Sequence, residues 1–443
     1  MRRLVPVVAA AILGGCRQPS FQSGPGTSSS AGDAGNTVGS GTGVTPADGG
    51  STGSASTDAG TTSSANGAIP TDRRTPSASC EGVIRPLPAV VTYQTSFDQV
   101  RSFSHHCGVT SEGEGNVALA VPRPVPERPY SWALLSREGK LIGSTEPPDH
   151  GFLIPNTVGY SLVSYDYNSS HYSASLWTID EFGHGRGVAT VLDGSVGFIP
   201  TSRAGFVLAL TSNSATAPDT IRVFADGTLL WGPKSLAKSG GVVSANIDDE
   251  GRVLVLQFGG DHSLAGQWFD RDGTDLTGSF VIGKDLVFGE NASFTGAPLH
   301  GSGLAIHKYD FAIGMGSFTV FENKWIAVVP SGSTEARAAP DWLTTRPGAS
   351  FVRTRGGYAL FHWDRGVKVQ PCVEHVELLS ATGASCGTLD VPVDSESCTP
   401  GGLGVGLDGT LLQMLPEELE TTPDPSRPYL KTCTLRFWPA ALP

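Results

Sequence analysis

The sequence predicts an all-β protein: a seven-bladed β-propeller of four-stranded antiparallel blades, preceded by a disordered linker. Three observations lead to this fold. The 443 residues include 57 glycines and 16% charged residues, which disfavours helices because glycine destabilises a helix interior by about 1 kcal/mol. A glycine followed by an apolar run recurs along the chain, and a turn signal keeps phase with it.

The first landmark is the repeat glycine, which precedes a short apolar segment such as Val253-Leu254-Val255 after Gly251. The repeat glycines, 44 to 54 residues apart, are Gly115, Gly159, Gly205, Gly251, Gly303, Gly357 and Gly409. A period of this size matches one propeller blade. We expect each of these glycines to open the inner strand of its blade.

The second landmark is a turn that follows each of the first six repeat glycines after 21 to 26 residues and is flanked by β-type segments. Asp-Gly and similar pairs supply the positive φ that tight hairpins need. The predicted turns are Glu138-Gly139, Phe182-Gly183, Asp226-Gly227, Asp272-Gly273, Asn323-Lys324 and Thr382-Gly383. Each unit therefore contains a hairpin after its inner strand.

The last unit is one strand short. Residues 433–438 supply its third strand, and too few residues follow for a fourth. The segment from Pro88 to Ser96, which contains Val90, Val91 and Tyr93, is suited to fill the outer position and fasten the ring.

On this repeat period and turn chemistry, residues 80 to 443 resemble the β-propellers of secreted proteins and lipoproteins of Gram-negative bacteria. Family signatures are absent or single: Trp-Asp pairs do not recur, and Gly356-Gly357 matches a kelch glycine pair once. The alternative is an array of two-sheet β-sandwiches with coincidental spacing.

Residues 1–15 form a predicted lipoprotein signal peptide. Arg2 and Arg3 precede an apolar run from Leu4 to Leu13, too short to span a bilayer of about 30 Å. The sequence Leu-Gly-Gly-Cys that ends at Cys16 resembles a bacterial lipobox, which implies that Cys16 carries the lipid and attaches the chain to a membrane. The alternatives are an ordinary signal peptide and a buried apolar strand.

Residues 16–78 form a predicted disordered tether between the lipid and a propeller domain at 79–443. Ser, Gly, Thr and Ala dominate the tether without apolar periodicity, and about 60 flexible residues span roughly 40 to 45 Å. Arg17, where some lipoproteins have aspartate, resembles the pattern sorted to the outer membrane. We expect a cell-envelope protein facing the periplasm or the cell surface. A net charge of −12 disfavours a nucleic-acid partner.

Seven cysteines leave six once Cys16 is assigned to the lipid. An even set in an exported protein predicts disulfides. Proximity favours the pairs Cys80 with Cys107, Cys372 with Cys386, and Cys398 with Cys433. A zinc site is disfavoured because the cysteines and histidines lack zinc-ligand spacing.

Ligands of a propeller meet loops that converge near its axis. Polar residues at the predicted inner-strand loops are Glu112, Glu114, Arg203, Asp248, Asp249, His300, Arg353, Arg355 and Asp408. Of these we select Asp248, Asp249, His300, Arg353, Arg355 and Asp408 as candidate ligand-binding residues for a protein or glycan. The alternative is that they are hydrated loop residues.

Three carboxylates, Asp270, Asp272 and Asp275, crowd one predicted turn. Converging carboxylate oxygens are the ligands that calcium prefers. The other units lack this set, so a solvated hairpin is the alternative, and we otherwise expect no cofactor.

Two functions fit the sequence. The first is a non-catalytic binding or scaffold module, since no nucleophile elbow, zinc-protease motif or phosphate loop is present. The second is an exported propeller enzyme, a glycosidase or lyase that uses two carboxylates on the axial face. Carboxylates such as Asp249 and Asp408, about 5 to 10 Å apart in one axial pocket, would favour the enzyme.

Overall fold

The computed structural model describes Cys80, residues 87–99 and residues 107–442 with gaps. The longer gaps are 123–129, 213–218, 237–241, 287–291, 362–372, 394–401 and 420–428. The signal peptide, Cys16 and the tether lie outside the described residues and stay predictions. The described residues belong to one compact unit that includes Thr71–Pro443, whereas Ser20–Pro70 fall in a second unit.

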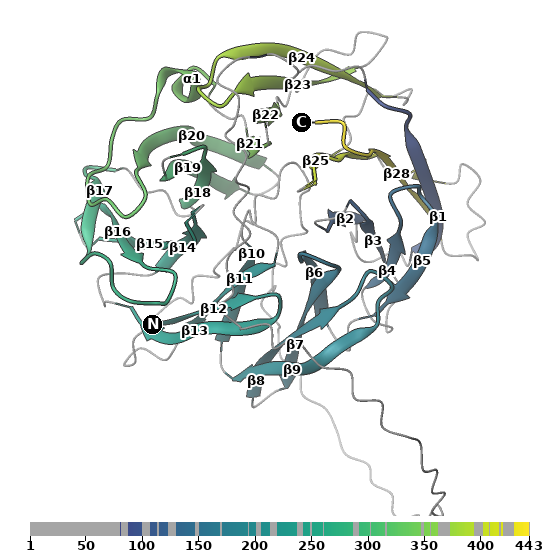
Figure 1. Ribbon diagram of the computed structural model, residues 1–443, viewed down its shortest axis with the longest axis horizontal. Coiled ribbons are helices and arrows are strands. Elements are labelled where there is room, and N and C mark those ends of the chain that lie inside the picture. The colour runs from purple at the N-terminus through teal and green to yellow at the C-terminus, as the bar shows by residue number, and fades with distance from the viewer. Residues whose placement is uncertain are drawn as a thin grey trace, which may run out of the picture. The chain divides into compact units, whose positions relative to one another are not determined.

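The described strands form seven antiparallel sheets, which follow one another around a ring (Figure 1). Blade 1 contains β2 (Gly108–Ser111), β3 (Val117–Pro122), β4 (Tyr130–Leu135) and β5 (Leu141–Thr145). Blade 2 contains β6 (His150–Pro155), β7 (Tyr160–Asn168), β8 (His171–Ile179) and β9 (Gly185–Asp193). Blade 3 contains β10 (Ser195–Pro200), β11 (Phe206–Ser212), β12 (Thr220–Ala225) and β13 (Thr228–Ser235).

Blades 4 to 7 complete the ring. Blade 4 contains β14 (Val242–Ile247), β15 (Val253–Phe258), β16 (Leu264–Phe269) and β17 (Phe280–Gly283), and blade 5 contains β18 (Ser293–Leu299), β19 (Gly303–Gly314) and β20 (Ser317–Val329). Blade 6 contains β21 (Ser350–Arg353), β22 (Gly357–Phe361), β23 (Val373–Ser380) and β24 (Ser385–Pro392). Blade 7 contains β25 (Gly402–Val405), β26 (Leu411–Met414), β28 (Tyr429–Trp438) and β1 (Val91–Gln99), with β27 (Glu418–Leu419) beside β28. The predicted seven-bladed propeller of four-stranded antiparallel blades is confirmed.

The repeat glycine begins or shortly precedes the second strand of each blade, so the expectation that it opens the inner strand is wrong. The continuous apolar run after the glycine reflects burial on both faces of the strand and does not show that the strand is the innermost one. Val253, Leu254 and Val255 of β15 have no exposed surface, and a strand that is covered on both faces becomes a continuous apolar run. Gly251 makes the sharp turn before this strand at a φ of 80°, a conformation that favours glycine.

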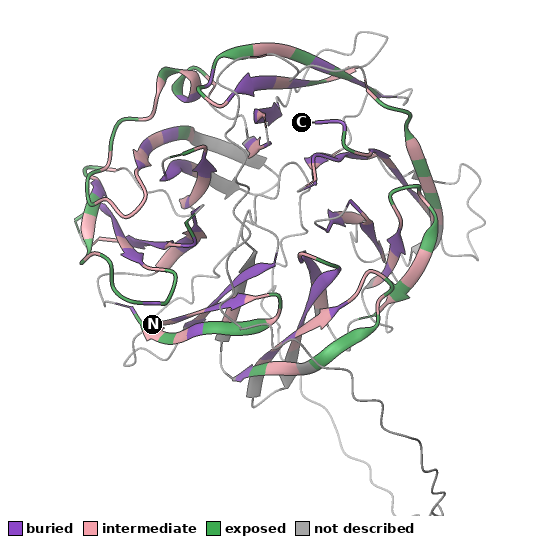
Figure 2. Cartoon of the chain, in the orientation of Figure 1, coloured by how far each residue is buried: buried purple, intermediate pink, exposed green. Residues whose placement is uncertain are grey.

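Alternate residues of a second strand face two different blades. Ala118 of β3 packs with Leu162 of blade 2, while Val117 and Leu119 pack with Leu435 of blade 7. The apolar core is thus divided into layers between neighbouring blades. Figure 2 shows the same gradient, with buried inner and middle strands and exposed segments on the outer strands.

Blade 5 departs from the four-stranded pattern in the described residues. An isolated bridge between Val328 and Arg337 takes the outer position, and the short helix α1 (Asp341–Thr344) follows. Just after this helix, Arg346 binds Glu377 of blade 6 through two hydrogen bonds of 2.8 and 2.6 Å. No helix among the described residues is long and apolar enough to cross a bilayer.

The predicted turn at Asn323-Lys324 is wrong, because both residues lie inside β20. The hairpin of β19 and β20 is longer than its counterparts, which moves the next turn toward the carboxyl end of the unit. That turn contains Gly332, with a φ of 66°.

The ring closes as predicted, through an outer strand that the N-terminal segment supplies to the last blade. β1 pairs with β28 in antiparallel register, from Val91 opposite Phe437 to Gln99 opposite Tyr429. In Figure 1 the dark blue β1 lies along the yellow β28 at the edge of blade 7. Hydrogen bonds between the first and last strands of the domain therefore hold the ring together.

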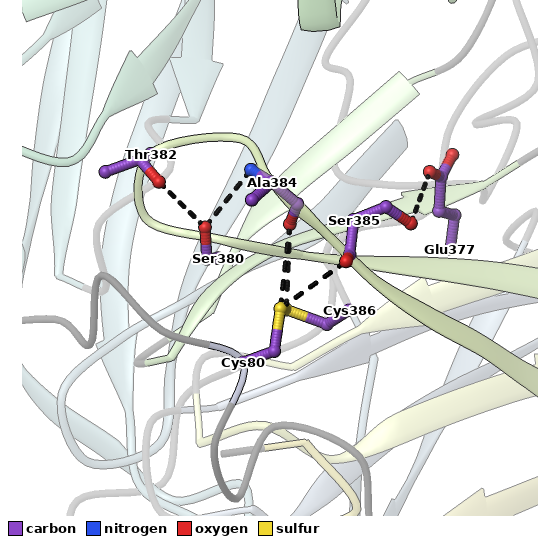
Figure 3. The surroundings of a disulfide bond; sticks show 7 residues. All are labelled: Cys80, Glu377, Ser380, Thr382, Ala384, Ser385 and Cys386. Carbon is purple, nitrogen blue, oxygen red and sulfur yellow. Dashed lines mark hydrogen bonds between the residues drawn. A yellow bond between two sulfur atoms is a disulfide. The ribbon is translucent and has the colours of Figure 1, made fainter.

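The disulfides reinforce this closure with a pairing that differs from the expected one. Cys80 is bonded to Cys386 of β24, and Cys107 is bonded to Cys433 of β28. Figure 3 shows Cys80 beside the hairpin that joins β23 to β24. The predicted pairs of Cys80 with Cys107, Cys372 with Cys386, and Cys398 with Cys433 are wrong, because closure brings distant cysteines together. Cys372 and Cys398 lie outside the described residues.

We expect Phe437→Ala to destabilise the domain by about 3 to 5 kcal/mol, because it opens a cavity at the closure. Phe437 is fully buried with Leu412 and Leu435 between blades 7 and 1. Thr92→Ala is the matched control, since Thr92 is an exposed residue of β1 and its loss should cost less than about 0.5 kcal/mol. Urea unfolding followed by circular dichroism measures both. If both variants lowered the free energy of unfolding equally, apolar packing at the ring closure would not be a main source of stability.

Candidate functional site

Strand direction divides the connections of the propeller between two faces. Turns after the first and third strands of a blade lie on one face, which we call the hairpin face. Connections after the second and fourth strands lie on the other, which we call the loop face. Most hairpin-face connections, such as that between Ser111 and Val117, are short, and the one between Phe269 and Phe280 is longer. Loop-face connections range in length from the one between Asn168 and His171 to the one between Phe361 and Val373.

The predicted ligand residues that the structure describes lie at the hairpin face, where two carboxylates cap turns. Asp248 Oδ1 accepts hydrogen bonds from the backbone N–H groups of Glu250 and Arg252, at 2.9 and 2.8 Å. Asp408 Oδ1 accepts one from Thr410 N at 3.0 Å, and its Oδ2 accepts the Thr410 hydroxyl at 2.7 Å. Each carboxylate therefore stabilises the loop from which it comes.

Asp248 also links blade 4 to blade 5. Its Oδ2 accepts a hydrogen bond from the Ser331 hydroxyl, and Arg252 Nη1 donates to the same hydroxyl at 2.9 Å. Arg252 pairs with Glu250 at 2.6 Å as well. Burial raises the pKa of Asp248, although the Ser331 hydrogen bond acts in the opposite direction. These contacts tie a turn of one blade to a turn of the next.

His300 links blade 5 to blade 6. Its backbone N–H donates to the Tyr358 hydroxyl at 2.8 Å, and its Nε2 lies 2.8 Å from the carbonyl oxygens of both Thr354 and Gly357. Carbonyl oxygens only accept, so Nε2 carries the proton. The His300 ring also packs on Tyr358, with centroids 5.1 Å apart.

The structure describes two more of the residues predicted at the inner-strand loops, Arg353 and Glu112. Arg353 is half-buried at the hairpin-face end of β21. Asp249, Arg355, Arg203 and Glu114 lie outside the described residues. The predicted carboxylate pair of Asp249 and Asp408 therefore lies partly outside the described residues. Glu112 is buried and caps the first hairpin, with Oε1 2.8 Å from Asn116 N.

The three carboxylates of the proposed calcium turn have separate contacts. Asp270 Oδ1 accepts a hydrogen bond from Arg271 N at 2.9 Å, and Asp272 Oδ1 accepts one from Thr274 N at 2.8 Å. Asp275 pairs with Lys234 of blade 3 at 3.2 Å. Within the described residues no three carboxylate, histidine or cysteine side chains are grouped to hold a metal.

Buried polar side chains gather toward the loop-face ends of the second strands, and sequence reasoning missed them. Thr211, Gln257, Lys308 and Gln413 are each less than 5% exposed. Their signal in the sequence is a polar residue inside or just after the apolar run of a repeat.

The densest of these polar groups is in blade 5. Lys308 and Asp310 of β19 are 1% and 3% exposed, with Lys308 Nζ 4.0 Å from Asp310 Oδ2. The adjacent His307 lies 2.6 Å from Asn323 Oδ1 through Nε2. Burial lowers the pKa of His307 to about 4, so this ring is neutral at pH 7 and Nε2 donates the hydrogen bond.

A second polar contact joins blades 6 and 7 near the loop face. Gln413 Nε2 of β26 donates to Glu374 Oε2 of β23 at 2.9 Å, and to Pro392 O at 3.3 Å. Burial raises the pKa of Glu374 to about 7, against the opposing effect of the Gln413 hydrogen bond. A carboxyl group with this pKa exchanges protons near neutral pH.

Comparisons with known proteins give matches to solved structures at low identity and low TM-score. No protein-family model and no curated protein matches the chain. Similar solved structures include the β-propeller domain of the Trilobed protease from Pyrococcus furiosus, at 13% identity over 60% of this chain and 78% of that chain with a TM-score of 0.37. Prolyl oligopeptidase B from Galerina marginata is 11% identical over 76% of this chain and 50% of that chain, with a TM-score of 0.42. TolB from Acinetobacter baumannii is 14% identical over 64% of this chain and 65% of that chain, with a TM-score of 0.33.

We expect Glu374→Gln to stabilise the domain above neutral pH by about 2 kcal/mol. The pKa of this carboxyl is about 7 in the folded chain, above its ordinary value of 4.5. Its contribution to stability is therefore fully present below pH 4.5 and is lost as the pH rises through 7. Urea unfolding at pH 4 and pH 8.5 should show equal stabilities at the lower pH and a more stable variant at the higher.

The matched control is Glu335→Gln, which removes a charge from an exposed residue of blade 5. Its effect should be small and should not grow between the two pH values. An unchanged difference between wild type and Glu374→Gln across this range would contradict the buried, proton-exchanging state of Glu374.

Proposed function

We propose that the chain is a lipid-anchored protein of the cell envelope that presents its propeller as a non-catalytic binding module. The lipobox-like sequence ending at Cys16 and the Ser/Gly/Thr/Ala-rich tether support attachment to the outer membrane. The observation that carries the location is the pair of disulfides at the ring closure, because disulfides persist in oxidising compartments.

The binding surface in this proposal is the loop face. On the hairpin face, the side chains of Asp248, His300 and Asp408 hydrogen-bond to turns of the propeller itself. Loop-face connections differ in length from blade to blade, and variable loops on a rigid scaffold are the usual place for recognition. The rigid ring holds these loops, and the tether holds the ring away from the membrane.

The proposed ligand is a polar one, a protein segment or a glycan. The connection between Phe361 and Val373 contains Trp363, Asp364 and Arg365, and the one between Pro122 and Tyr130 contains both arginine and glutamate. Aromatic and charged side chains together suit ligands that carry hydroxyl or amide groups. The net negative charge continues to disfavour nucleic acid.

Cys16→Ala tests the anchor. The substitution removes the thiol that would carry the lipid, so we expect loss of a fatty-acid label and release of the chain into the soluble periplasmic fraction. Fractionation with radiolabelled palmitate measures both, and Cys80→Ser is the control that leaves Cys16 intact. A Cys16→Ala chain that still carries label, or stays in the membrane fraction, would refute the anchor.

Glycan and peptide arrays test the binding module. The full chain with Cys16→Ala is compared with two variants: one has residues 123–129 and 362–371 replaced by glycine and serine at equal length, and the other carries Glu138→Ala and Lys140→Ala in an exposed hairpin-face turn. We expect the loop-face variant to lose at least tenfold in affinity for any probe bound, with little change in the hairpin-face variant. Binding that only the hairpin-face variant loses would contradict the loop face. Release of cleaved probe would favour the enzyme instead.

A further inference from the structure

The disulfides of this propeller connect cysteines that are not neighbours in the chain. The order along the sequence is Cys80, Cys107, Cys372, Cys386, Cys398 and Cys433. The bonds join Cys80 to Cys386 and Cys107 to Cys433, with separations of 306 and 326 residues. Each bond therefore joins the start of the domain to its last two blades.

An unfolded chain favours different bonds. Closing the short loop between Cys80 and Cys107 is roughly forty-fold more probable than closing the loop between Cys80 and Cys386, because closure probability falls with loop length. Export from the amino terminus adds to this bias, since Cys80 and Cys107 reach the oxidising compartment before Cys386 is present. Oxidation in order of arrival thus produces the pair Cys80–Cys107.

That neighbour pair is incompatible with the closed ring. Cys80 is held against blade 6, with its Cα 5.0 Å from that of Cys386. Cys107 is held against blade 7, with its Cα 6.0 Å from that of Cys433. A bond between Cys80 and Cys107 uses both sulfurs and excludes both native bonds. A chain oxidised in this way must exchange its disulfides before the ring can close.

We propose that the chain depends for its maturation on a thiol–disulfide isomerase, an exported enzyme with a reactive thiolate. This inference rests on the proposed export of the chain. The enzyme's thiolate attacks the Cys107 sulfur of a Cys80–Cys107 bond, and Cys80 leaves as a thiolate that takes up a proton. The Cys433 thiolate then attacks the mixed disulfide at Cys107, which forms the native bond and releases the enzyme's thiolate.

This exchange needs no net oxidant. One disulfide is broken for each one formed, and the proton lost by Cys433 balances the one gained by Cys80. The Cys433 side chain has no exposed surface in the closed ring, so the isomerase acts on the chain before closure.

Refolding of the full chain tests the dependence. The Cys16→Ala chain is reduced, unfolded and refolded with glutathione disulfide, either alone or together with reduced protein disulfide isomerase. Peptide mapping without reduction then measures the fraction of Cys80 bonded to Cys386 and to Cys107. We expect the isomerase to raise the native fraction at a fixed early time at least fivefold, and the oxidant alone to accumulate Cys80–Cys107. Equal native fractions with and without isomerase would overturn the proposal.

A variant without the competing cysteines provides the control. Cys107→Ser, Cys372→Ser, Cys398→Ser and Cys433→Ser together leave Cys80 and Cys386 without a competing partner, so we expect the benefit of isomerase for Cys80–Cys386 to fall below twofold. If the isomerase still raised the native fraction as much as in the parent chain, competing bonds between neighbouring cysteines would not be the reason that the chain needs it. If this variant does not fold, Cys107→Ser with Cys372→Ser removes the neighbour partners of both Cys80 and Cys386 and, mapped at the same early time, provides the same comparison.

Expression in bacteria with and without a periplasmic disulfide isomerase separates this proposal from the proposed location. A mispaired chain in the mutant and a native chain in the parent support both. Free thiols in both strains would contradict export, while the refolding result would still decide whether the chain needs an isomerase.

Discussion

The pairing of β1 with β28 is the contact on which the rest of the structure depends. Every blade of a propeller covers two neighbours, so an open ring exposes two apolar faces at once. Here the exposed faces would include Phe437 and Leu435 on one side and Leu119 on the other, all of which are buried between blades 7 and 1. The backbone ladder and the bond between Cys107 and Cys433 close this gap together, so hydrogen bonding, apolar burial and covalent linkage act on the same strand.

Much of this fold follows from periodicity. Repeat glycines and Asp-Gly turns reveal the number of units, and the missing strand of the last unit reveals how the ring closes. Radial position is harder to read, because an apolar run such as Val253 to Leu256 shows that a strand is covered on both faces but not how near it lies to the axis. The disulfides were missed for another reason. Proximity in sequence determines which cysteines meet in the unfolded chain, whereas Cys80 and Cys386 come together only when the ring closes.

The candidate site, too, could be predicted only in part from the sequence. Sequence reasoning places Asp248 and Asp408 in turns, and both are there, but an aspartate that caps a turn and one that binds a ligand have the same local pattern. Only the hydrogen bonds to Arg252 N and Thr410 N reveal the capping contacts. Lys308 and Gln413 were missed because a single polar residue in an apolar run carries no information about its partners. Variable loops, by contrast, are visible in the sequence only as irregular spacing.

The bond between Cys80 and Cys386 has a mechanical consequence. Any pull on the segment that precedes Cys80 reaches Cys80 before it reaches β1. The covalent bond passes this load to β24, which is paired along its length with β23 inside blade 6. β1 is thereby relieved of tension that would otherwise peel it from β28 one hydrogen bond at a time, beginning at Val91. If the chain is anchored as we propose, tension would enter the ring at blade 6, one blade away from the pairing of β1 with β28, and the ring would stay closed.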